Sequence, residues 1–256
     1  MKCYPGFAGV VDKEALSLLL KYNYIPAPYC IYKNFFKLSP GAVITFGSDG
    51  KVVNEYAYWS LKQAAESAGR AVFSGSDREA IDELQLRLES SIADQMLADV
   101  PLGAFLSGGV DSSTVVALMQ KQSARPIKTF TIGFTEAGFD EAIHAGEVAR
   151  HLGTDHTELY VGAKDALSII PKLAGIYCEP FADSSQIPTF LVSQMASELV
   201  TVALSGDGGD ELFGGYNTYQ FALECGLSCQ KSRSVFEKLY RASLSTLQTG
   251  RNSKNS

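Results

Sequence analysis

Hydrophobic and polar positions between residues 100 and 204 follow two alternating patterns. Short runs rich in branched and aromatic residues have the length of buried strands, and they lie at 100–106, 127–134, 156–161 and 199–204. Between them, apolar residues recur at helical spacing, in the segments 111–119, 140–152, 163–177 and 187–198. This alternation predicts an α/β fold with an open, doubly wound, mostly parallel sheet and helices on both faces. We expect the third of these helices to break or begin near Pro171.

The first 72 residues have a different composition, rich in Tyr, Phe and Pro, and we expect them to form an accessory or linker segment. Helical spacing predicts a helix over 14–22, and two prolines make 25–29 an extended segment rather than a central strand. The AVITF run at 42–46, a Ser-Asp-Gly turn and residues 51–59 predict a hairpin. The pattern therefore indicates a collar that packs on the main domain.

A connector and a long helix are predicted ahead of the first buried strand. Residues 61–76 are polar and contain Ala, Gly and Ser, which favours a connector. From Asp77, a suitable N-cap, a helix is predicted that ends before Pro101. Its apolar row consists of Ile81, Leu84, Leu88, Ile92 and Met96. We expect the main domain to span 73–229 and a helical, disordered and truncated tail to follow at 230–256.

Composition and charge exclude several classes of protein. The chain has 256 residues and a formal net charge of -6, without a long basic run, which excludes nonspecific binding to nucleic acid. No stretch is long and apolar enough to span a membrane. The five scattered cysteines indicate free thiols in a reducing compartment, so we expect a cytoplasmic protein.

The loop SGGVDSS, residues 107–113, joins a predicted strand to a predicted helix. The first amides of a helix have no partner inside it, and the two glycines let the main chain approach an anion. The serines add hydroxyl donors, and Asp111 can hold a divalent metal. No GxxxxGK[ST] string occurs and the loop has no lysine, which disfavours γ-phosphate transfer and favours release of pyrophosphate.

A second loop, SGDGGDELFGGY at 205–216, is rich in glycine and in acids that can bind a cation or act as a base. It also follows a predicted strand. Because the carboxyl ends of parallel strands lie at one edge of a sheet, near the point where strand order reverses, we expect both loops to face one ligand.

SGGVDSS resembles the PP-loop of the N-type ATP pyrophosphatases. Together, DVPLGAFLSGGVDSS and LSGDGGDELFGGY resemble the synthetase domain of glutamine-hydrolysing asparagine synthetase, class B type. Further similarity to that family lies in TFTIGF, FDEAIHAGEVARHLGTDHTEL, EPFADSSQIPTF and YIPAPYCIYKNFFKLSPG. The resemblance covers residues 12–220, and the pair of loops makes it specific.

The resemblance implies a two-step reaction. The side-chain carboxylate of aspartate attacks the α-phosphate of ATP, which gives β-aspartyl-AMP and pyrophosphate, and ammonia then displaces AMP. ATP and Mg²⁺ are the implied cofactors, and ATP, aspartate and ammonia the implied small-molecule partners. A glutaminase domain is expected in the complete protein, and a homodimer is an expectation that the sequence leaves open.

The resemblance also assigns roles to residues of the two loops and their strands. Asp111 and Asp210 would hold Mg²⁺, and Asp207, where many members have glutamate, would act in forming and consuming the acyl-adenylate. Asp183 and Ser184 would approach the amino-acid substrate. Pyrophosphate would be cradled by Ser107, Gly108, Gly109, Ser112 and Ser113. The nucleotide site would be lined by Leu106, Ile132, Gly133, Ser205 and Gly206.

The chain departs from the family pattern in two places. Cys3 follows Lys2, whereas the family's nucleophilic cysteine comes directly after the first methionine, and no glutaminase-like sequence follows it. The family's lysine downstream of the acidic loop is also absent, so an excised or incomplete synthetase is expected. Two alternatives stay open: a relative that adenylates another carboxylate (a sugar acid, a peptide or a β-amino acid), and an ATP-binding fragment without catalysis. The three histidines, His144, His151 and His156, are expected at ordinary surface positions.

Overall fold

The computed structural model describes residues 6, 7, 9–135, 141–219, 221 and 222. The chain divides into two units, residues 1–205 and 206–256, and each is described by itself. The predicted tail at 230–256, together with Cys3, Cys225 and Cys229, lies outside the described residues. The boundary expected between residues 72 and 73 stays a prediction.

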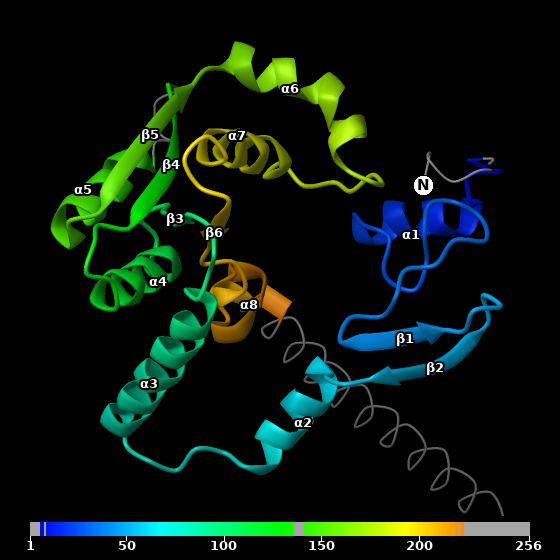
Figure 1. The fold of residues 1–256 in the computed structure, drawn as a ribbon, viewed down its shortest axis with the longest axis horizontal. Coiled ribbons are helices and arrows are strands. Elements are labelled where there is room, and N and C mark those ends of the chain that lie inside the picture. The colour runs from blue at the N-terminus through cyan, green and yellow to red at the C-terminus, as the bar shows by residue number, and fades with distance from the viewer. Residues whose placement is uncertain (1–5, 8, 136–140, 220, 223–256) are drawn as a thin grey trace, which may run out of the picture. The chain divides into compact units, whose positions relative to one another are not determined.

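The first unit is built on a parallel sheet of four strands in the order β5-β4-β3-β6 (Figure 1). The strands are β3 (Leu102–Phe105), β4 (Lys128–Phe134), β5 (Asp155–Val161) and β6 (Val202–Leu204). In register, Gly103 pairs with Lys128 on one side and with Ala203 on the other. All pairings are parallel, so the predicted sheet type is confirmed. Strands β3 and β6 are shorter than the apolar runs that predicted them, 100–106 and 199–204.

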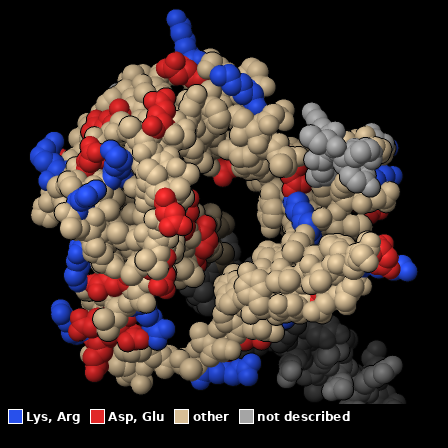
Figure 2. Space-filling model, viewed as in Figure 1, with Lys and Arg blue, Asp and Glu red and all other residues tan. Residues whose placement is uncertain are grey.

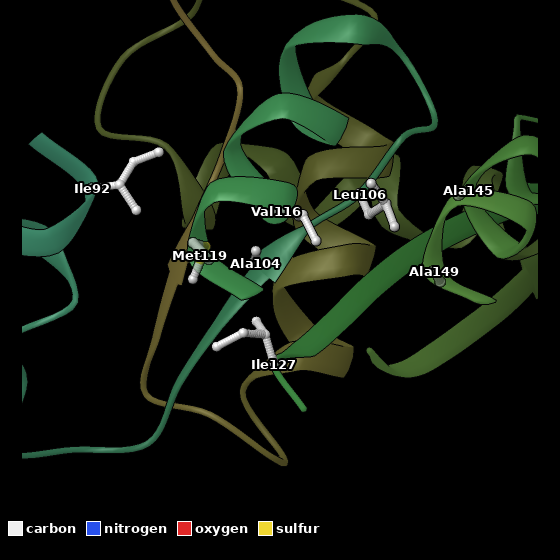
Figure 3. Close-up of a cluster of buried hydrophobic side chains, with 8 residues drawn as sticks. All are labelled: Ile92, Ala104, Leu106, Val116, Met119, Ile127, Ala145 and Ala149. Atoms are coloured by element: carbon white, nitrogen blue, oxygen red, sulfur yellow. The ribbon is translucent and has the colours of Figure 1, made fainter. Parts of the chain in front are cut away.

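Helices cover both faces of this sheet, as the alternating pattern predicted. One face carries α3 (Asp77–Gln95), α4 (Val110–Lys121) and α5 (Ala142–Leu152). The other carries α6 (Ala163–Ile176) and α7 (Gln186–Ala196). Figure 3 shows the first core, in which Leu106, directly after β3, lies beside Val116 of α4, and Ala104 of β3 lies near Met119 of α4. On the opposite face, Phe130 packs against Ala196 and Val200. The α/β fold class is therefore confirmed.

Strand order reverses next to β3. The chain runs from β3 outward to β4 and β5, and then returns to place β6 on the other side of β3. The carboxyl ends of β3 and β6 are consequently neighbours, and Leu106 and Ser205 follow them at the same edge. In open α/β sheets this reversal point is where ligands bind.

The N-terminal part of the first unit contains α1 (Lys13–Tyr22) and the antiparallel hairpin of β1 (Ala42–Phe46) and β2 (Val52–Ala57). Both agree with the sequence. The expectation of an extended segment at 25–29 is wrong for its middle, because Ala27 and Pro28 form a turn closed by a hydrogen bond from the Tyr29 amide to the Pro26 carbonyl at 3.0 Å. Glu179 ties this part to the sheet-bearing part, because it forms an ion pair with Lys37 and accepts a hydrogen bond from the Ile31 amide at 3.4 Å.

The expected connector at 61–76 is wrong for its first ten residues, which form helix α2 (Leu61–Arg70). Ser60 caps this helix by accepting a hydrogen bond from the Gln63 amide at 3.5 Å. None of its residues is buried, which explains why the sequence shows no apolar row at helical spacing there. Its Lys, Gln, Ala and Glu residues have high intrinsic helix propensity, and that propensity outweighs Gly69.

The long helix α3 begins one residue earlier than predicted, because Ser76 and not Asp77 is the N-cap. Ser76 Oγ accepts from the Glu79 amide at 3.4 Å, and Glu79 Oε2 accepts from the Ser76 amide at 2.8 Å, which is a capping box. The hydrogen bonds from Ser76 lower the pKa of Glu79. Of the apolar row only Ile92 is buried, whereas Ile81 and Leu84 are exposed.

Loss of this capping box is expected to destabilise the first unit. Ser76→Ala removes the acceptor of the Glu79 amide, and such N-cap replacements cost about 1 kcal/mol. Urea denaturation followed by circular dichroism measures the change in the free energy of unfolding. Ser90→Ala, an exposed serine inside the same helix, is the matched control and is expected to lose nothing. Equal stability of the two variants would contradict the assignment.

The break expected near Pro171 is absent, because α6 runs without interruption from Ala163 to Ile176. Proline removes one amide donor, whose acceptor four residues earlier would be Leu167. Leu167 is exposed, so the missing hydrogen bond lies on the solvent side of the helix. Ile169 is buried beside Val161 and Leu191 and holds the helix on the sheet. Among the described residues, no helix is long and apolar enough to cross a membrane.

Candidate nucleotide-binding site

The turn between β3 and α4 depends on glycine at position 108. Gly108 has φ +81°, a conformation that residues with a Cβ rarely adopt. A Cβ built there would lie 2.8 Å from the Ala145 amide nitrogen and 2.8 Å from His144 Cβ. The turn therefore lies directly against the first residues of α5, and the backbone has no room for a larger residue.

Two serines hold the shape of this turn. Ser107 Oγ and Ser112 Oγ are 2.9 Å apart, and the Ser107 amide donates to Ser112 Oγ at 3.2 Å. The Gly109 amide in turn donates to Ser107 Oγ at 3.3 Å. Because these groups bond within the turn, the loop is preorganised by its own side chains.

Donors for an anion lie on the next residues. Helix α4 starts after Gly109, and no side chain caps it. The amides of residues 110–112 consequently have no acceptor within the helix, and the helix dipole favours negative charge at this end. Ser113 Oγ is shielded from solvent and has no hydrogen-bond partner in the described part of the chain. Strand end, tight glycine turn and uncapped helix together form a cradle suited to phosphate oxygens.

The other predicted lining residues of the first unit occupy different surroundings. Leu106 is buried in the core, and its amide donates to the Phe130 carbonyl at 2.9 Å, so it adjoins the cradle through its main chain. Ile132 on β4 is half-buried, and its side chain faces α6 and α7. A Cβ on Gly133 would lie 2.6 Å from the Tyr160 ring and 3.0 Å from Ala142 Cβ. Ser205 directly follows β6, the neighbour of β3.

The acidic loop, apart from Ser205, belongs to the second unit. It folds around α8 (Gly209–Phe213), with Gly208 at φ +93° before the helix and Gly214 at φ +70° after it. Asp210 packs its carboxylate against Gly215, whose amide donates to the Asp210 carbonyl at 3.0 Å. Tyr216 OH donates to Glu211 Oε1 at 3.2 Å, and this hydrogen bond to a carboxylate raises the pKa of Tyr216. The Asp207 side chain is exposed.

The described residues contain no group of three or more His, Cys, Asp and Glu side chains that could hold a metal by themselves. On the cradle, Asp111 supplies one carboxylate in the first turn of α4. A cation at this position would therefore take most of its ligands from a bound phosphate and from water.

Asp183 and Ser184 precede α7 in a structured turn. Asp183 Oδ1 accepts from the Ser185 amide at 2.8 Å, and the Asp183 carbonyl accepts from Gln186 Nε2 at 2.8 Å. The amide of Ala182 also donates to the Asn23 carbonyl at 2.7 Å. The Asp183 side chain thus stabilises the start of α7, whatever else it does.

The expectation that all three histidines are ordinary surface residues is wrong for His156. Only 11% of its side chain is exposed, and its Nδ1 lies 2.8 Å from Thr129 Oγ1. Burial lowers its pKa, partly opposed by the nearby Glu158 carboxylate. The sequence held one signal: His156 and Glu158 are two apart in a strand, so they share a face.

The lowered pKa of His156 makes stability depend on pH. An unfolded histidine takes up a proton at about pH 6.5, whereas folded His156 does so only at lower pH. Stability contributed by neutral His156 is thus present above about pH 6.5 and is lost as pH falls through the folded pKa. The charged group near it is the Glu158 carboxylate, and β4 presents the Thr129 hydroxyl to it.

We expect His156→Asn to reduce the loss of unfolding free energy between pH 7.5 and pH 5.5. Urea denaturation at both pH values measures this difference. His144→Asn, which replaces a histidine with a 74% exposed side chain, is the control and should keep the wild-type pH dependence. Parallel pH profiles for wild type and His156→Asn would show that His156 titrates normally.

Comparisons with known proteins give the following matches. The sequence model of the family described as asparagine synthase matches residues 83–254. A putative asparagine synthetase (glutamine-hydrolyzing) 2 from Methanocaldococcus jannaschii is 40% identical over 210 residues, which cover 82% of this chain and 39% of the relative. Asparagine synthetase (glutamine-hydrolyzing) 1 from Bacillus subtilis is 34% identical over 210 residues, covering 82% of this chain and 32% of the relative. The chain therefore spans well under half the length of these relatives.

Solved structures give weaker likenesses. An NH3-dependent NAD synthetase from Campylobacter jejuni aligns with a TM-score of 0.38 and 13% identity, over 53% of this chain and 60% of that one. A glutamine-dependent NAD+ synthetase from Acinetobacter baumannii aligns with a TM-score of 0.41 and 20% identity, over 68% of this chain and 31% of that one. TM-scores this low do not indicate a shared function.

Proposed function

The chain belongs to the asparagine synthase family, and from this premise we propose that it activates aspartate with ATP. An oxygen of the aspartate side-chain carboxylate attacks the α-phosphorus of ATP. A new P–O bond forms, the bond between the α-phosphorus and the bridging oxygen breaks, and pyrophosphate leaves. Ammonia then attacks the acyl carbon, AMP departs with the bonding electron pair, and the amine loses a proton to give asparagine.

The cradle between β3 and α4 is the observation that carries the proposal. Its uncapped amides can meet phosphate oxygens, Gly108 lets the main chain approach them, and beside them the shielded Ser113 hydroxyl has an unused hydrogen bond. It carries no lysine, so the donors suit a leaving pyrophosphate rather than a transferred γ-phosphate. Charge that develops on the leaving group is stabilised by donors already in place, an effect of about 3–4 kcal/mol for one good donor.

The serines divide into two roles in this proposal. Ser107 and Ser112 bond to each other and shape the turn, so their contribution to pyrophosphate binding is through the geometry of the loop and its amides. Ser113 is the hydroxyl that has a free hydrogen bond to offer. In the first unit, the nucleotide-lining role is proposed for Leu106, Ile132, Gly133 and Ser205, with Leu106 acting through its main chain. Gly206 of the second unit has this role only from the family resemblance.

Magnesium fits the cradle as a partner of phosphate oxygens. Asp111, in the first turn of α4, is the carboxylate of the first unit that would hold it, and Asp210 is assigned the same role from the family resemblance. When bound, Mg²⁺ neutralises charge on the phosphates and on leaving pyrophosphate. Asp111 itself contributes negative charge that attracts the cation and sits favourably at a helix N-terminus.

Asp207 is proposed as the catalytic carboxylate of the acidic loop. Its side chain is exposed on a loop shaped by Gly208, where small molecules in solution can reach it. A carboxylate is a suitable base toward the ammonium that forms when ammonia attacks the acyl carbon. Its side chain is one methylene shorter than that of the glutamate found in many members of the family.

The wider setting is proposed from the relatives. Their names describe glutamine-hydrolysing enzymes, so ammonia would come from glutamine in a protein that includes a glutaminase domain. Cys30 and Cys178 are free thiols, which supports a reducing, cytoplasmic setting. On the face that Figure 2 shows, acidic and basic side chains intermingle over the described residues. This face therefore offers no extended basic surface that could bind nucleic acid.

Product analysis tests the proposal. The chain is incubated with ATP, Mg²⁺, aspartate and ammonium, and the nucleotide products are separated by ion-exchange chromatography. The proposal predicts AMP and pyrophosphate in equal amounts, together with asparagine. Formation of ADP and phosphate would place cleavage at the γ-phosphate and contradict the proposal. AMP formed equally well without aspartate would be hydrolysis of ATP by water, and would contradict the activation of aspartate.

A further inference from the structure

A half-buried ion pair joins the segment between α6 and α7 to the N-terminal part of the first unit. Glu179 pairs with Lys37, and only 20% and 32% of their side chains are exposed. Both partners also bond to main-chain groups of the N-terminal part: Glu179 Oε2 accepts from the Ile31 amide at 3.4 Å, and Lys37 Nζ donates to the Ile25 carbonyl. Because Ile25 and Ile31 are buried in a small core of their own, the ion pair is anchored on packed backbone. It is also screened less by solvent than an exposed pair.

Further hydrogen bonds fix the residues that follow the ion pair. The Ala182 amide donates to the Asn23 carbonyl at 2.7 Å, so the backbone here bonds directly to the backbone after α1. Gln186 Nε2 donates to the Asp183 carbonyl at 2.8 Å. Residues 179–185, which we call the tethered segment, are therefore held at one end by the N-terminal part and at the other by the first residue of α7.

The packing of α7 shows at which edge of the sheet the tethered segment lies. Near the end of α7, Ala196 packs against Phe130, early in β4. Near its start, Ile187 belongs to the cluster that contains Phe134, the last residue of β4. Helix α7 therefore runs antiparallel to β4, and the tethered segment lies toward the carboxyl edge of the sheet. The phosphate cradle is at this same edge, where open α/β sheets bind ligands.

Two polar side chains of the tethered segment suit an amino-acid substrate. Asp183 and Ser184 are exposed, and the family resemblance assigns them to approach that substrate. A carboxylate attracts the α-ammonium group of an amino acid, and a hydroxyl can donate to its α-carboxylate. Such contacts depend on placement within about 1 Å, so a shift of the segment's backbone weakens them even where the two side chains are unchanged.

We propose that Lys37 and Glu179 are positioning residues for the amino-acid side of the site, because their ion pair holds the tethered segment at the carboxyl edge of the sheet. Both act through the backbone of this segment and not on the substrate itself. The N-terminal residues 23–37, which the sequence indicated as part of a linker or collar, are then a support of the site. The inference rests on the proposed function for the identity of the ligand, aspartate.

Breaking the ion pair from the N-terminal side tests the proposal. Lys37→Met removes the ammonium group and keeps a similar aliphatic length. We expect about a tenfold higher KM for aspartate and about tenfold faster hydrogen exchange at the Ala182 amide, while ATP affinity stays at the wild-type value. Lys128→Met is the matched control, since it breaks an ion pair with Asp155 at the amino edge of the sheet, and it should change none of these quantities. A wild-type KM for aspartate, or wild-type exchange at Ala182, in Lys37→Met would overturn the proposal.

Two further variants separate positioning from general stability. Lys37→Arg keeps a cationic donor and is expected to restore most of the wild-type KM. Ile92→Val lowers stability from the core on the opposite face of the sheet and should leave the KM for aspartate unchanged. An equal rise in this KM for Lys37→Met and Ile92→Val would make the ion pair merely structural. If the wild type forms no AMP with aspartate, the proposed function fails, and exchange at the Ala182 amide then decides whether the ion pair holds the segment.

Discussion

Gly108→Ala is expected to weaken ATP binding about 100-fold, the effect of displacing a binding group by about 1 Å. Alanine at this position is strained by the positive φ of +81°, and its methyl group meets backbone and Cβ atoms of His144 and Ala145 that cannot rotate away. Either α5 or the turn must shift, and the amides at the start of α4 move with the turn. Isothermal titration with ATP and Mg²⁺ measures the affinity.

Two control variants separate the causes of this effect. Gly153→Ala carries the same kind of strain at φ +70° but meets nothing within 4 Å, so it should lower stability and leave ATP binding intact. Gly109→Ala meets only Ser107 Oγ at 3.3 Å and has an ordinary φ of -70°, so a smaller loss is expected. Wild-type affinity in Gly108→Ala would show that the turn does not contact the phosphates.

Asp207→Asn is expected to lower the rate of asparagine formation about 100-fold, within the range for loss of a general base. The amide keeps the size of the side chain but cannot accept a proton at neutral pH. ATP affinity should change little, because the phosphate donors lie on the cradle of the first unit. Steady-state rates with ammonium, combined with ATP titration, measure both quantities.

The control for this substitution lies in the same short loop. Glu211→Gln alters an exposed carboxylate that accepts a hydrogen bond from Tyr216, and it is expected to retain activity. Asp207→Glu should also remain active, since the proposed role needs a carboxylate of adequate reach. A parallel fall in ATP affinity and in rate for Asp207→Asn would indicate a binding role instead of a catalytic one.

Most of the sheet was predictable because its strands are apolar and are separated by regular helices. The run at 127–134 became β4 almost unchanged, since it lies inside the sheet with a partner on each side. The run at 199–204 yielded only the short β6, an edge strand that pairs with β3 through Leu102, Gly103 and Ala104. Apolar character alone does not tell how far such a strand pairs.

Features without an apolar signal were the ones missed. Helix α2 buries no residue, so its evidence lay in propensity and in the Ser60 cap. The shielded position of His156 was missed because Thr129 and His156 come together only through the register of β4 and β5. Sequence spacing can place His156 and Glu158 on one face, but it does not show which strand lies beside them.

The cradle was the most predictable part of the candidate site. Strand, double glycine and helix start are local in sequence, and the structure joins them as expected, with Gly108 at positive φ. The side-chain roles were less accessible, because the bond between Ser107 and Ser112 and the unpartnered Ser113 hydroxyl depend on rotamers and on neighbours.

The most direct test of the central claim is exchange of radiolabelled pyrophosphate into ATP, with aspartate and Mg²⁺ but without ammonia. This exchange reports the first half-reaction alone, because it requires reversible formation of the acyl-adenylate. We predict aspartate-dependent exchange in the wild type and its loss in Gly108→Ala. The claim would be contradicted if a folded wild-type chain binds ATP but moves no label from pyrophosphate into ATP when aspartate is present. It would also be contradicted if this exchange occurs only with a different carboxylic acid.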